Sequence, residues 1–133
     1  MYTFFYRSSP HPMLTAFDTP RFNVTCTRRG RSNTPLQSLM VANDPGLFEL
    51  AEALADRVLS EKETTEDRVQ QMFRHALCRY PTQEEMDFLV GFLQTQNRKF
   101  MKTEKGTESD ALRYAWIAVA RVLMNLDEFI TRE

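Results

Sequence analysis

Cysteine, histidine and glycine are scarce in this sequence of 133 residues, which contains two cysteines, two histidines and four glycines. The cysteines, Cys26 and Cys78, have no metal-ligand spacing, and the C-x-x-C-H motif that attaches haem is absent. The glycines do not form a phosphate-binding loop of the Walker type. We therefore expect no metal site and no cofactor, and a domain of this size does not need a disulfide bond.

Long apolar runs are also missing. None approaches the roughly 18 residues that a membrane-spanning helix requires, so we expect no membrane span. The aromatic-rich stretch Met1–Met13 is interrupted by Arg7 and two prolines, which is not the pattern of a signal peptide. As the sequence stands, it predicts a cytoplasmic protein.

The net charge of −1 hides an uneven distribution. Residues 1–35 carry five arginines and one aspartate, whereas residues 36–133 carry 12 basic and 17 acidic residues. A basic front and an acidic body can attract each other within one chain, so the asymmetry does not require an external anion. Because the body is acidic and Arg28, Arg29 and Arg31 alone would make few phosphate contacts, we do not expect nucleic-acid binding.

Apolar residues recur every three to four positions after Thr34, which is the spacing of helices. Helix-start signals stand at Thr34 followed by Gln37, at Asp44 before a proline, and at Thr82 followed by Glu85. The sequence therefore predicts an all-α fold, a small bundle of four main helices and one short helix over residues 34–133. The expected helices cover residues 35–42, 45–59, 65–77, 82–96 and 108–126.

Residues 1–33 read as an extended N-terminal arm followed by a basic loop. The alternation typical of a strand is weak there and the prolines lack the N–H donor that a sheet needs, so we expect extended chain and turns rather than a sheet. The aromatic side chains either pack across the helical body or meet a partner surface. The residues of this hypothetical partner interface are Phe4, Phe5, Tyr6 and Phe17.

Arginines precede the predicted helix start at Thr34. A helix N-terminus offers free N–H groups and partial positive charge, so nearby arginines would strengthen an anion site. The alternative is that these arginines pair with acids of later helices and hold the loop on the body. The hypothetical anion- or ligand-binding residues are Arg28, Arg29, Arg31, Asn33 and Thr34.

Short motifs follow one another in a definite order along nearly the whole chain. In the first half they are Tyr2-Thr3-Phe4, Ser9-Pro10, Leu14-Thr15-Ala16-Phe17-Asp18, Arg28-Arg29, Asn33-Thr34-Pro35-Leu36-Gln37 and Asn43-Asp44-Pro45. Near the end they are Ala115-Trp116, Arg121-Val122-Leu123 and Asn125-Leu126-Asp127-Glu128-Phe129. This succession resembles the C-terminal part of the planctomycete-specific domain-one family, whose members are domains of unknown function.

The resemblance implies a chain that is the C-terminal fragment of a larger exported protein, with a cytochrome c-like module and a second domain upstream. It transfers no catalytic residues, and no nucleophile–base pair or paired carboxylates stand out in the sequence. We expect a non-catalytic helical interaction or structural module that packs against the missing upstream domains or another protein. The alternative is an anion- or carbohydrate-binding module, contributing to an enzyme site through the Arg28–Thr34 loop.

Overall fold

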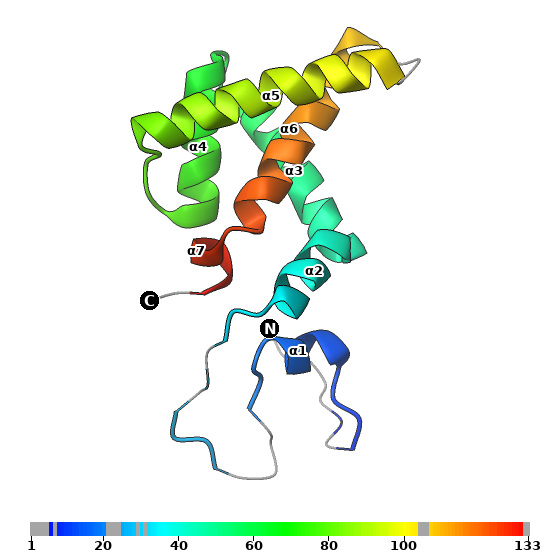
Figure 1. The fold of residues 1–133 in the computed structure, drawn as a ribbon, viewed down its shortest axis with the longest axis vertical. Helices are drawn as coiled ribbons and strands as arrows, with labels where there is room; N and C mark the ends of the chain where they lie inside the picture. The colour runs from blue at the N-terminus through cyan, green and yellow to red at the C-terminus, as the bar shows by residue number, and fades with distance from the viewer. Residues whose placement is uncertain are drawn as a thin grey trace.

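The computed structural model of the chain describes residues 6, 8–20, 25–28, 30, 32–103 and 107–131. Within these residues the protein has seven helices and no strand, which confirms the predicted all-α bundle (Figure 1). No helix in this part of the chain is long and apolar enough to cross a membrane. The helices are α1 (Pro12–Ala16), α2 (Pro35–Asn43), α3 (Pro45–Glu61), α4 (Thr65–Leu77), α5 (Gln83–Thr103), α6 (Glu108–Met124) and α7 (Asp127–Ile130).

The core of the bundle lies among α3, α4, α5 and α6. Helix α6 packs against the other three, most extensively against α5, and its apolar residues are buried around much of its circumference. The largest fully buried side chains include Trp116 of α6 and Phe73 of α4. In Figure 1, α5 lies across one end of the molecule, and α1 lies at the opposite end.

The predicted helix starts are present as hydrogen-bonded caps. The Thr34 hydroxyl accepts from the Gln37 N–H while the Gln37 side chain accepts from the Thr34 N–H. Asp44 accepts from the backbone N–H of Leu47, at 3.0 Å. Each cap satisfies an N–H group that the helix itself leaves unpaired, and this is why the local sequence determines these boundaries.

The structure departs from the sequence prediction at several places. Helix α1 forms inside the stretch expected to be extended, because His11 accepts from the Met13 N–H and Pro12 fits the first helical position. Helix α5 continues to Thr103, although a loop was expected from Asn97. The last long helix ends at Met124 rather than near residue 126, and the chain then turns into α7.

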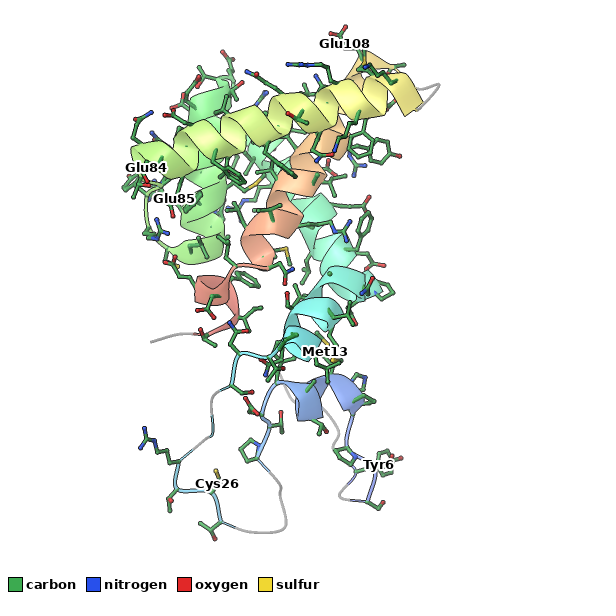
Figure 2. All side chains as sticks on the ribbon, in the orientation of Figure 1. Tyr6, Met13, Cys26, Glu84, Glu85 and Glu108 are labelled. Carbon is green, nitrogen blue, oxygen red and sulfur yellow. The ribbon has the colours of Figure 1, made fainter. Side chains whose placement is uncertain are left out.

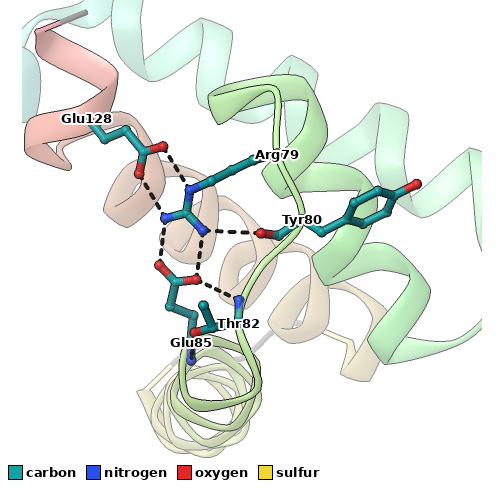
Figure 3. A network of polar contacts seen from close by, with 5 residues as sticks. All are labelled: Arg79, Tyr80, Thr82, Glu85 and Glu128. Carbon is teal, nitrogen blue, oxygen red and sulfur yellow. Dashed lines mark hydrogen bonds and ion pairs between the residues drawn. The ribbon is translucent and has the colours of Figure 1, made fainter. Parts of the chain in front are cut away.

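A cluster of charged side chains holds the turn between α4 and α5 against α7 (Figure 3). The Arg79 guanidinium donates two hydrogen bonds to Glu85 and two to Glu128, at 2.7 to 2.8 Å, and a fifth to the Tyr80 carbonyl at 3.1 Å. Its carbon lies 5.1 Å from the centroid of the Phe73 ring. The fork geometry of arginine suits this double bidentate pairing.

The same contacts shift the ionisation of the cluster. Hydrogen bonds from Arg79, together with those from Thr82, lower the pKa of Glu85 from 4.5 to about 2. Arg79 also lowers the pKa of Glu128, and the hydrogen bonds to the two carboxylates raise the pKa of the Arg79 guanidinium. All three groups are therefore charged at neutral pH, and their ion pairs hold the α4–α5 turn against α7 there.

Candidate functional site

The predicted ligand residues precede α2, and the structure describes three of the five. Arg28 is exposed, and its side chain forms no hydrogen bond or ion pair within the described residues. Cys26, two positions before it, lies in a loop away from the helical bundle (Figure 2). Arg29 and Arg31 lie outside the described residues.

The polar side chains of Asn33 and Thr34 both form hydrogen bonds within the protein. Thr34 caps α2. The Asn33 amide donates to the Asp127 carboxylate at the start of α7, so it joins the end of the arm to the end of the bundle. One turn into α2, the Ser38 hydroxyl donates to the Asn125 amide oxygen at 2.8 Å. These bonds position the loop before α2 against the C-terminal segment.

We call the contact between the N-terminal arm and α2 the arm–α2 junction. Gln37 lies at its centre, with hydrogen bonds to Thr34, Ala16 and Ser32. Its side chain is 1% exposed, and it is the only buried polar residue among those the structure describes. Beyond the cap at Thr34, its amide nitrogen donates to the Ala16 carbonyl at 2.7 Å and to the Ser32 hydroxyl at 2.9 Å. A buried amide with all its partners present is stable, whereas losing one partner leaves an unpaired polar group.

Asp18 completes the junction. Its carboxylate accepts from the Ser32 backbone N–H at 2.8 Å and from the Ser32 hydroxyl at 2.6 Å. Asp18 has a φ of 56°, a left-handed conformation that aspartate tolerates better than most residues. Two segments of the arm, 16–18 and 32–34, are thereby fixed to α2 by side-chain bonds.

The orientation of α2 does not follow from the spacing of its apolar residues. Leu36, Leu39 and Met40 share one face of the helix by their spacing, which periodicity alone places toward the core, but Leu36 and Leu39 are 60% and 59% exposed. The buried residues of α2 are Gln37 and Val41. The side-chain amide of Gln37 therefore faces the arm, and the side chains of Leu36 and Leu39 are exposed to water.

The predicted partner interface is described only in part. Tyr6 is 63% exposed, whereas Phe17 is half-buried and packs against the core. Phe4 and Phe5 lie outside the described residues. The role of these aromatic residues at a partner surface therefore stays a prediction.

Sequence reasoning missed two features of this half of the molecule. It identified Gln37 only as a cap, and no local pattern reports the Ala16 carbonyl that the same amide binds. It also missed the partner of Arg121, which donates to the Ala42 carbonyl at 2.7 Å and lies over the Phe48 ring. The only local signal was an arginine within the apolar second half of α6.

The hydrogen bonds of the arm–α2 junction hold backbone segments in place. The Asp18 carboxylate accepts from Ser32, and the Asp127 carboxylate accepts from Asn33. Within the described residues no group of three or more His, Cys, Asp or Glu side chains could hold a metal ion. The two cysteines are free and exposed.

Comparison with known proteins identifies a family but no characterised relative. No curated protein matches the chain, and no solved structure matches it. The family PSD1, described as a protein of unknown function (DUF1553), matches residues 1–93. Because this match covers more than half of the sequence, including the arm, the arm–α2 junction and the first turns of α5, the chain belongs to the PSD1 (DUF1553) family.

Proposed function

We propose that this chain is a non-catalytic interaction module that packs against another protein surface through the exposed side of α2. The observation that carries the proposal is the orientation of that helix. Leu36 and Leu39 are 60% and 59% exposed while Gln37 of the same helix is buried. Apolar side chains three positions apart are neighbours on a helix surface, so the two leucines form one contact.

The energetics favour covering this contact. Leu50, on the adjoining helix α3, is also 58% exposed. Each square ångström of apolar surface removed from water contributes about 25 cal/mol, so burying several leucines on a partner is strongly favourable. The bonds of Gln37 hold α2 in one orientation, which lowers the entropic cost of presenting its leucines to a partner.

The partner we propose is a protein surface with matching apolar side chains. The family resemblance suggests upstream domains of the same polypeptide, and a separate protein is the other possibility. Exposed Tyr6 of the arm would extend the contact.

Position-specific photo-cross-linking in the protein's native cells tests the proposal. A photoreactive residue replaces Leu39 in one variant and Phe88, which is 65% exposed on α5, in a matched control. We expect a defined adduct with one protein, or with one upstream segment, at position 39 and none at position 88. Mass spectrometry of the cross-linked peptides identifies the partner.

A second variant tests whether the cross-link at position 39 comes from a specific contact rather than from a random collision. Adding Leu36→Glu to the variant with the probe at position 39 places a charge in the contact, and it should lower the adduct yield about tenfold. Circular dichroism checks that the helices remain. Identical adducts at positions 39 and 88, or none at position 39, would refute the proposal.

The anion- or carbohydrate-binding alternative stays a prediction. Among its described residues only Arg28 keeps an uncommitted side chain, because Asn33 and Thr34 are bonded within the chain. Titrating phosphate, sulfate and an acidic sugar against the protein and against an Arg28→Ala/Arg29→Ala variant tests it. Equal binding by both proteins would exclude this function.

A further inference from the structure

A groove of about 550 Å³ lies between the α2–α3 junction and the helices α5 and α6, apart from the leucines proposed to meet a partner. Its walls are mostly apolar and include the aromatic rings of Phe48, Phe92 and Phe100. Pockets that bind small molecules share this size, roughly 300 to 1,000 Å³, and are lined by apolar side chains with a few polar groups. The polar groups of the groove therefore indicate its ligand.

Arg121 is the one charged side chain among the described residues that line the groove. Its guanidinium donates one hydrogen bond, to the Ala42 carbonyl, and lies 5.4 Å from the centroid of the Phe48 ring. No carboxylate in the described part of the chain lies within ion-pair distance of it. A guanidinium has five N–H donors, so four remain for a ligand or water.

The surroundings hold this guanidinium in place. The Ala42 carbonyl belongs to the last turn of α2, where the partial negative charge of the helix attracts a cation. The Phe48 ring supports the flat face of the guanidinium by a cation–π contact. Gln96, across the groove on α5, makes no side-chain hydrogen bond within the described residues and can also turn toward a ligand.

We propose that this groove binds a small amphipathic carboxylate, with its apolar tail along the aromatic walls and its carboxylate on Arg121. A carboxylate matches the planar fork of arginine and can accept two parallel hydrogen bonds. A neutral molecule with the same tail gains nothing from the charge. A cation would be repelled by Arg121, which forms no ion pair with a carboxylate of the described residues.

Calorimetric titration with decanoate, below its micelle-forming concentration, tests the proposal on the intact chain. We expect saturable binding at one site. Acetate, which has the carboxylate without the tail, should give no measurable heat. The alcohol 1-decanol, which has the tail without the charge, should bind more weakly than decanoate.

Two substitutions separate the charge from the cavity. Arg121→Gln should weaken decanoate binding about tenfold, the effect of losing a charge-assisted hydrogen bond pair, and leave 1-decanol binding unchanged. Ala118→Phe places a ring in the groove and should weaken both ligands. If the Arg121→Gln protein does not fold, the Ala118→Phe protein decides alone.

Arg74 provides the matched control. It is an exposed arginine whose guanidinium lies 5.3 Å from the Tyr80 ring centroid, outside the groove. Arg74→Gln should leave decanoate affinity at the wild-type value. The proposal is overturned by absent decanoate binding, by equal losses in the Arg74 and Arg121 variants, or by unchanged affinity in Ala118→Phe.

Discussion

The turn between α4 and α5 and the junction between α2 and α3 each place an arginine against a phenylalanine ring, and they use it differently. Arg79 directs all five N–H donors to partners within the chain. Arg121 directs one donor to the chain, to the Ala42 carbonyl. The first arginine joins two helices and a turn, and the second keeps its charge available. An arginine on a ring is therefore structural or available for binding according to how many carboxylates the fold brings to it.

The two arginines should differ most in the free energy of unfolding that is lost when each charge is removed. Arg79→Met leaves Glu85 and Glu128 facing each other unpaired, and we expect a loss of about 1 to 2 kcal/mol after allowing for the third of the side chain in water. Arg121→Met should change the free energy of unfolding by no more than about 0.5 kcal/mol. Urea unfolding of both variants measures this, and equal losses would contradict the comparison.

The two acids of the Arg79 cluster should not be equivalent. Glu85 also accepts from the Thr82 N–H, at 2.7 Å, as part of the α5 cap, whereas Glu128 is bonded only to Arg79 within the described residues. Glu85→Gln should therefore cost about 1 kcal/mol in urea unfolding, and Glu128→Gln should cost less. A larger loss in the Glu128 variant would show that docking of α7, rather than the cap, controls this region.

Acid should weaken the Arg79 cluster within a defined window. The pKa of Glu85 is about 2 in the folded protein against an ordinary 4.5, so its stabilisation is complete above pH 4.5 and is lost as the pH falls toward 2. The stability difference between wild type and Glu85→Gln should shrink across that window. The difference between wild type and Arg121→Met should not follow it, because Arg121 forms no ion pair with a carboxylate in the part of the chain that the structure describes.

Salt should give the smallest effect. Added sodium chloride screens exposed ion pairs, so it should reduce the advantage of wild type over Arg79→Met by a few tenths of a kcal/mol. The Arg121→Met difference should stay constant, since the bond to a carbonyl involves no opposite charge. Urea unfolding at low and high salt provides the measurement. Equal salt dependence of the two stability losses would mean that both arginines stabilise the fold through ion pairs.

Local patterns predicted the main helices and their starts. The apolar spacing of α3, α4 and α6 placed residues such as Val58, Phe73 and Leu123 in the core, where they are fully or almost fully buried. The pairs Thr34 with Gln37 and Thr82 with Glu85 predicted caps that the structure contains. These features depend on atoms within one turn of helix, so a short stretch of sequence contains what is needed to infer them.

Contacts across the chain were beyond such inference. Leu36 and Leu39 of α2 lie in water while Gln37 of the same helix is buried, because its amide donates to the Ala16 carbonyl 21 positions away. Asn33 similarly donates to Asp127, which is 94 positions away, and no rule of helical spacing predicts a contact between such distant residues.

The sequence by itself determined that the chain forms helices, where most of them begin and which residues form most of the core. Helical periodicity and capping act over three or four residues, and their energies are local. Only the tertiary structure decided which face of α2 stays in water and which arginine is left without a carboxylate. Those outcomes depend on which polar groups meet when distant segments pack, because a buried donor must find its acceptor wherever the fold places one.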